Sequence, residues 1–254
     1  MKPMLRYHWW MNIAIGGFAL LITGAFADPS LSASSSQVPP PTSSQALQER
    51  PFGLPFAEPP GPSTWLMVQP YGNTVGAFRQ RNTTYRAGQG LHFGIDLAAR
   101  CGTPIVAIGD GVVSEVDAAF HGAGPHNLMI DHPNGYASFY GHLLERPALS
   151  PGQPVRRGQV IAKVGDPDGT CRSRPHLHLE IRDAPAHRRA YNPVLLIEAD
   201  WDSLALVGGF SRGFQRDLTD PRRWQFLEDQ PEVIFGGPLL NDFAVPWPPE
   251  WRAP

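Results

Sequence analysis

The stretch NLMIDHPNGYASFYGH, residues 127–142, determines the fold class. Strand-like runs at 127–131 and 136–142 flank Pro133-Asn134-Gly135, a turn sequence typical of a β-hairpin. Outward from this hairpin the chain continues in short strand-like runs beside turn residues, at 104–108, 112–116, 160–164 and 176–182. No convincing amphipathic helix occurs between residues 100 and 185. The pattern predicts a mainly β protein, built as a compact antiparallel domain of sandwich or barrel type.

The N-terminal segment has the layout of an export signal. Lys2 and Arg6 precede an apolar stretch, and the small-x-small sequence Ala25-Phe26-Ala27 follows it. This layout predicts a secretory signal peptide over residues 1–27. An uncleaved membrane anchor is the alternative, because the apolar stretch is nearly long enough to span a bilayer of about 30 Å. Either way we expect an exported protein, periplasmic or extracellular at the cell envelope.

Composition divides the rest of the chain into three parts. Residues 28–63 contain nine Pro and eight Ser, which predicts a linker, although part of it could cover the domain as an inhibitory segment. Residues 64–199 hold the strand pattern. Residues 200–254 contain four Trp, five Phe and seven Pro, so we expect an irregular, aromatic-rich C-terminal extension packed on the domain. An aromatic surface that binds sugar or wall polymer is the alternative for this extension.

The charge of the chain excludes one class of partner. The formal net charge is −2, and it becomes −4 (19 basic against 23 acidic residues) when residues 1–27 are left out. The chain therefore lacks the basic face of a nucleic-acid-binding protein, and we expect no nucleic-acid partner. Any affinity for an anionic polymer must come from a specific groove. We expect a monomer.

The only two cysteines are Cys101 and Cys171. In an oxidising compartment two cysteines can pair, and we expect a disulfide here, with two free thiols as the alternative. A bridge closing a loop of this length would stabilise the fold by about 4 kcal/mol in the chain-entropy model.

Histidine and aspartate residues form a pattern with metal-ligand chemistry. His92 and Asp96 are both good Zn²⁺ ligands, but four residues of a flat strand span about 13 Å, too far to share one metal. We therefore predict a bulge or sharp bend at Gly94. On a strand, His176 and His178 point to one face, above an apolar backing on the other. His142 ends a strand-like run and enters a loop.

These residues resemble the signatures of the lysostaphin/LytM-type zinc metallopeptidase family. The matching stretches are His92-Phe93-Gly94-Ile95-Asp96-Leu97-Ala98, Tyr140-Gly141-His142-Leu143 and Pro175-His176-Leu177-His178-Leu179-Glu180-Ile181-Arg182. The resemblance covers roughly residues 65–197, and the three signatures in this order are highly specific. It implies the duplicated hybrid motif fold of that family. The segment with Cys171, Arg172 and Arg174 departs from the family pattern, and the C-terminal extension has no counterpart that we recognise.

The resemblance also implies residue roles. His92, Asp96 and His178 would bind Zn²⁺, and His142 and His176 would be the catalytic pair. Three protein ligands and an open position for water are typical of a catalytic zinc site. The implied reaction is hydrolysis of peptide bonds in peptidoglycan stem peptides or cross-bridges by a zinc-activated water. One free histidine would move the proton of the water to the leaving amine, and the other would stabilise the oxyanion, in an order that the sequence leaves open.

Two other functions remain open from the sequence. The chain could be a catalytically silent wall-binding regulator of another hydrolase, or a zinc protease with a substrate outside the wall. The presence of all five signature positions favours an active endopeptidase. Arg172 and Arg174 could favour a substrate carboxylate. We interpret the remaining histidines as surface or structural residues: His121, His126, His132 and His187.

Overall fold

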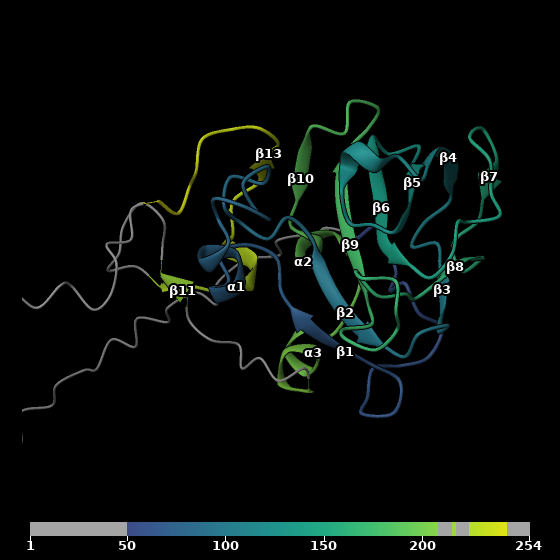
Figure 1. Ribbon diagram of the computed structural model, residues 1–254, viewed down its shortest axis with the longest axis horizontal. Coiled ribbons are helices and arrows are strands. Elements are labelled where there is room, and N and C mark those ends of the chain that lie inside the picture. The colour runs from purple at the N-terminus through teal and green to yellow at the C-terminus, as the bar shows by residue number, and fades with distance from the viewer. Residues whose placement is uncertain (1–49, 208–214, 217–223, 243–254) are drawn as a thin grey trace, which may run out of the picture. The chain divides into compact units, whose positions relative to one another are not determined.

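The computed structural model describes residues 50–207, 215–216 and 224–242 (Figure 1). The expected signal peptide, most of the expected linker and the end of the C-terminal extension lie outside these residues. Within the part of the chain that is described, no helix has both the length and the apolar character that a membrane crossing requires.

An antiparallel sheet of nine strands forms the body of the domain, with β9 at its centre (Figure 1). Its main path runs β1-β2-β9-β6-β5-β4-β7, and β10 pairs with β9 and β13. These strands are β1 (Trp65–Gln69), β2 (Ile95–Ala99), β4 (Gly111–Val116), β5 (His126–Asp131), β6 (Tyr136–Leu143), β7 (Pro154–Val155), β9 (His176–Asp183), β10 (Arg189–Tyr191) and β13 (Val233–Ile234).

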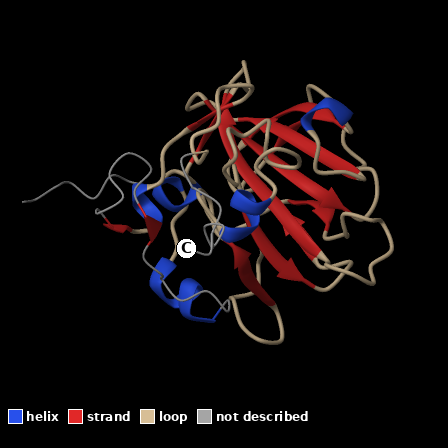
Figure 2. Ribbon diagram, turned by 60° about the vertical axis from the view of Figure 1, so that its left-hand side comes forward, coloured by secondary structure: helices blue, strands red, loops and turns tan. Residues whose placement is uncertain are grey.

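Two short sheets and a few helical turns complete the described residues. The pairs are β3 (Pro104–Val106) with β8 (Val160–Lys163), and β11 (Gln215–Arg216) with β12 (Trp224–Gln225). The helices are α1 (Val75–Arg79), α2 (Pro193–Leu196) and α3 (Trp201–Val207), with 3₁₀ turns η1 (Ala119–His121) and η2 (Leu227–Asp229). Strand predominates over helix throughout (Figure 2), so the predicted mainly β class is confirmed.

The predicted hairpin is present. β5 and β6 pair antiparallel with Asp131 opposite Ala137, and Gly135 has a φ of +84°, a conformation that glycine adopts without steric cost. The described strands do not close into a barrel. Instead the β3–β8 pair contributes Ile105 and Ile161 to the core that the large sheet covers, which gives a sandwich-like arrangement.

Apolar and polar side chains alternate along β9, so its two faces have different roles. Leu177, Leu179 and Ile181 are fully buried on one face, in the main hydrophobic core. The opposite face carries the polar residues that build the site. One edge of β9 pairs with β2 and then β10, and the other pairs with β6. The strand with two histidines is therefore fixed on both edges.

Residues 50–63 also pack on the domain. The side chain of Phe52 is 1% exposed, its backbone N–H donates to the carbonyl of Leu196 at 3.1 Å, and Phe56 packs on Trp65 with ring centroids 5.2 Å apart. Ordered contacts thus begin before the predicted boundary at residue 64. Composition alone does not reveal this packing, because the contacts of Phe52 are with residues far away in the sequence, at Tyr136 and Leu196.

Residues 230–241 of the C-terminal extension lie against residues 71–90, which precede β2. Val233 pairs with Ala190 of β10, and the Tyr71 hydroxyl donates to the carbonyl of Pro231 at 2.9 Å. The Asn241 amide, which is fully buried, donates to the carbonyl of Gly90 at 2.6 Å. These contacts hold the backbone immediately before His92. Trp247 and Trp251 lie outside the described residues.

Candidate active site

A bend at Gly94 brings His92 and Asp96 together, as the spacing predicts. β2 begins only at Ile95, and His92 lies outside it, in a β-bridge with Gly72. The distance from His92 Nε2 to Asp96 Oδ1 is 3.2 Å. Glycine is required because a Cβ atom at position 94 would lie 2.6 Å from the carbonyl oxygen of Leu179 on β9.

Each of these side chains is oriented by its partners. His92 Nδ1 lies 2.8 Å from the carbonyl of Pro70, so this nitrogen is the donor and the lone pair of Nε2 faces the site. Asp96 lies opposite His178 in the β2–β9 register, with 2.8 Å between its Oδ1 and His178 Nδ1. His178 Nε2 contacts Glu180 Oε1 at 3.1 Å, which leaves Nδ1 directed at Asp96.

Glu180 is held by a buried ion pair. Its carboxylate is fully buried and accepts from Arg182 Nε at 2.7 Å and from Arg182 Nη2 at 3.0 Å. The Arg182 guanidinium lies between the rings of Phe139 and Phe235, 4.7 and 4.4 Å from their centroids. This ion pair fixes the carboxylate that orients His178, an arrangement typical of the residues behind a metal ligand.

The three side chains fit a zinc ion. Bonds of about 2.0–2.2 Å in a tetrahedron place ligand atoms roughly 3.2–3.6 Å apart. The separations from His92 Nε2 lie in this range, at 3.2 Å to Asp96 Oδ1 and 3.3 Å to His178 Nδ1. The 2.8 Å between Asp96 Oδ1 and His178 Nδ1 is a hydrogen-bond distance below it. Two nitrogen donors and one carboxylate match the chemistry that zinc prefers. The two imidazoles also hold the pKa of Asp96 well below its ordinary value, although burial opposes this.

His142 and His176 lie beside these three residues. Their rings have centroids 4.7 Å apart, and His176 Nε2 lies 3.8 Å from Asp96 Oδ1. His142 Nδ1 faces the carbonyl of Gly124 at 2.5 Å, and His176 Nδ1 faces that of Arg174 at 2.6 Å. A carbonyl can only accept, so Nδ1 carries the proton in both rings and Nε2 has a free lone pair. Burial and the neighbouring His178 lower the pKa of His142 to about 4.

All five side chains line one cavity of about 950 Å³. Its walls come from the segment before β1, from the loop after α1, from the η1 turn and from the loop before β9. Tyr85 is a lining residue that the sequence did not indicate, because it lies in a turn-rich segment without a pattern. Its ring centroid is 5.7 Å from that of His92, and its hydroxyl bonds to Gln69. Tyr140, in contrast, is fully buried, with its hydroxyl on Ser138 and Ile108, and does not line the cavity.

A second group with metal-ligand chemistry lies apart from the five residues. Glu115, His121 and His187 have ligand atoms within 4.8 Å of one another. Arg182 donates to His121 Nδ1 at 2.7 Å, so Nε2 of that ring carries the proton and donates to Glu115 Oε2 at 2.8 Å. No lone pair of His121 is then free for a metal. His187 donates to Asp131 at 2.7 Å, and the group is a hydrogen-bonded network.

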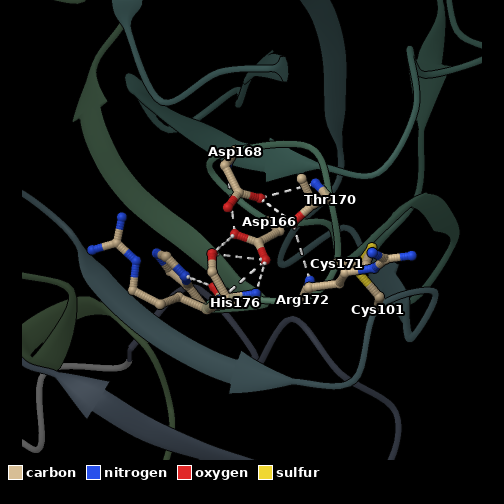
Figure 3. Close-up of a disulfide and its surroundings, with 9 residues drawn as sticks. Cys101, Asp166, Asp168, Thr170, Cys171, Arg172 and His176 are labelled. Atoms are coloured by element: carbon tan, nitrogen blue, oxygen red, sulfur yellow. Dashed lines mark hydrogen bonds between the residues drawn. A yellow bond between two sulfur atoms is a disulfide. The ribbon is translucent and has the colours of Figure 1, made fainter.

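The loop before β9 is fixed by a disulfide and an aspartate (Figure 3). Cys101 and Cys171 are bonded to each other, as expected. Asp166 accepts from the backbone N–H groups of Ser173 and Arg174, at 2.9 and 3.0 Å. Burial opposes ionisation of Asp166, yet these hydrogen bonds lower its pKa to about 2. The disulfide and these hydrogen bonds therefore hold the loop that positions His176 in the cavity.

Known proteins are similar to part of this chain. Peptidoglycan DD-endopeptidase ShyC of Vibrio cholerae is 40% identical over 90 residues, which cover 35% of this chain and 19% of the relative. DD-carboxypeptidase/endopeptidase Mpg of Neisseria meningitidis is 45% identical over 94 residues, which cover 36% and 20%. A solved zinc-containing peptidase from Vibrio cholerae is 28% identical with a TM-score of 0.43, over 59% of this chain and 40% of that chain.

The family model of peptidase family M23 matches residues 90–193. This range includes all five residues of the cluster. The matched segments span about a fifth of the length of the two curated relatives. Residues 90–193 of this chain are a peptidase family M23 domain.

Proposed function

We propose that this chain is an exported zinc-dependent endopeptidase that hydrolyses peptide bonds in peptidoglycan stem peptides or cross-bridges. One observation carries the proposal. The donor atoms of His92, Asp96 and His178 converge within 3.3 Å of one another, with two of the three separations in the range of zinc ligands, and two further histidines stand beside them in the same cavity.

The residues divide into two roles. His92, Asp96 and His178 would hold the metal, and a zinc ion bound there would lower the pKa of a bound water to about 7 and polarise the scissile carbonyl. His142 and His176 act through Nε2. One accepts the proton of the attacking water and passes it to the leaving amine, and the other, when protonated, donates to the developing oxyanion. The Nδ1 contacts to Gly124 and Arg174 keep both rings in the orientation that this requires.

The substrate class is supported by the relatives and by the cavity. ShyC and Mpg are both named for peptide-bond hydrolysis, and ShyC for peptidoglycan. A cavity of about 950 Å³ beside the histidines has room for several residues of a peptide.

Export is supported by the chemistry of the cysteines. A structural disulfide between Cys101 and Cys171 is typical of the periplasm or the exterior and is rare in the cytosol. The signal-like composition of residues 1–27 agrees with this. Fractionation of cells that express the tagged chain tests the location. Recovery in the cytoplasm alone would overturn this part of the proposal.

Hydrolysis of purified peptidoglycan fragments by matched histidine variants tests the function. We expect His142→Ala to retain about one zinc per chain and to lose most activity, because it removes a proton carrier but no ligand. His126→Ala is the control, since that histidine pairs with Asp117 outside the cluster. Near-normal turnover by His142→Ala would contradict the role assignment. Zinc binding without hydrolysis by the unmodified chain would favour a silent regulator.

A further inference from the structure

Two arginines line the same cavity without a hydrogen-bond or ion-pair partner for their side chains among the residues that the structure describes. Arg100 and Arg174 are exposed lining residues, and among the described residues neither guanidinium forms an ion pair or a hydrogen bond. Within the described ranges, Asp96 is the only acidic residue that lines the cavity, and its carboxylate faces the histidine cluster. The cavity thus presents two free positive charges at one end, although the chain as a whole has a formal net charge of −2.

Strand register explains why the two arginines share this face. β2 and β9 pair antiparallel, with Asp96 opposite His178 and Ala98 opposite His176. All four residues line the cavity. Arg100 lies one residue after β2 and Arg174 two residues before β9, next to the end of the register at which Ala98 faces His176, and both arginines line the cavity. At about 3.3 Å per residue of extended chain, the backbone of Arg174 lies up to about 7 Å from that of His176 and up to about 13 Å from that of His178.

The two segments that carry the arginines are fixed to each other. Cys101 follows Arg100 directly, and its disulfide partner Cys171 lies three residues before Arg174. The backbone N–H of Arg174 is in turn bound by the buried carboxylate of Asp166 at 3.0 Å. The two guanidinium groups are therefore anchored on a constrained backbone, which reduces the entropy lost when they bind a ligand.

We propose that Arg100 and Arg174 form a subsite for a free carboxylate of the peptide substrate, about two to four residues from the scissile bond. This inference rests on the proposed function. Guanidinium groups recognise carboxylates through paired, charge-assisted hydrogen bonds, and an unpartnered pair beside a peptide-cleaving centre selects a substrate with a carboxylate at that distance. The group recognised is a C-terminal carboxylate or an acidic side chain of the peptide.

Matched peptides that differ only in one group test the subsite. Each pair carries either a free carboxylate or the primary amide at the same position, and the position is varied from two to four residues from the cleaved bond. We expect kcat/KM to be about tenfold higher for the free acid at one of these positions. This factor corresponds to the lower end of the range of stabilisation by hydrogen bonds to charged groups, as is appropriate at an exposed site. The Arg100→Gln/Arg174→Gln double variant should lose this preference, mainly through KM.

Arg172→Gln provides the control, because Arg172 lies in the same loop and is exposed but does not line the cavity. Equal kcat/KM for acid and amide at all positions, or an equal effect of Arg172→Gln, would overturn the proposal. Calorimetric binding of both peptides to His142→Ala separates this inference from the proposed function. A preference for the acid supports the subsite even if the unmodified chain hydrolyses nothing, and equal binding of acid and amide counts against it.

Discussion

Replacement of Gly94 by alanine should weaken zinc binding without unfolding the domain. A Cβ atom at this position would lie 2.6 Å from the carbonyl oxygen of Leu179, 2.8 Å from His178 Cε1 and 3.0 Å from Glu180 Cγ. The nearest atom belongs to the backbone of the central strand, so the clash cannot be relieved by a side-chain rotation. β2 must move away from β9, and Asp96 moves with it.

The size of the effect follows from these distances. Relief to an ordinary contact of about 3.4 Å requires a shift of roughly 0.8 Å from 2.6 Å, and relief to 3.0 Å requires about 0.4 Å. Ligand distances in metal sites tolerate about ±0.2 Å. We therefore expect zinc affinity to fall about 10–100-fold, as when other supporting residues are changed. Overpacking should also lower the free energy of unfolding by about 1–3 kcal/mol.

Competition with a chelator of known affinity measures the zinc dissociation constant, and thermal unfolding of the metal-free protein measures the stability. Gly76→Ala is the matched control, because the nearest atoms to its Cβ position lie at 3.6 Å or more. A zinc affinity of Gly94→Ala within about threefold of the unmodified protein, measured on folded protein, would refute the reasoning.

Three further predictions follow from the same structure. Replacement of Cys101 and Cys171 together by alanine should lower the free energy of unfolding by about 4 kcal/mol, because the bridge closes a loop with a sequence separation of 70, and denaturant unfolding measures this. His178→Ala should lose both zinc and activity, whereas His142→Ala should lose activity alone; metal analysis that finds zinc in His178→Ala would contradict the ligand assignment. The pKa of Asp166 is lowered to about 2, so its contribution to stability is present above about pH 4 and is lost as the pH falls towards 2. The stability difference between the unmodified protein and Asp166→Asn should therefore shrink over that range in acid titrations, and a constant difference would count against it.

Much of the fold could be predicted because its signals are local. The turn at Pro133-Asn134-Gly135 sets one hairpin, and alternation along β9 separates the leucines of the core from His176 and His178. The bend at Gly94 also follows from local reasoning, since a flat strand cannot bring His92 and Asp96 to one point.

Other features depend on contacts between distant segments. Phe52 is buried beside residues near 108 and 196, so its segment has no signal of its own. Tyr85 reaches the cavity from a loop without periodicity. Tyr140 shares a strand with His142, but His142 has a φ of +56°, which breaks the alternation, so Tyr140 turns into the core and bonds Ser138 while His142 lines the cavity. A regular alternation assigns both residues to one face.

Metal content and peptide release, measured together on the purified chain, test the central claim most directly. Zinc per chain is determined before and after removal with a chelator, and each sample is incubated with purified peptidoglycan sacculi. We predict that the untreated chain contains about one zinc and releases new peptide termini from the sacculi. After chelation the chain should contain no zinc and release no new termini, and restored zinc should restore the activity. A folded chain that binds no zinc, or that releases the same peptides after its metal has been removed, would contradict the account.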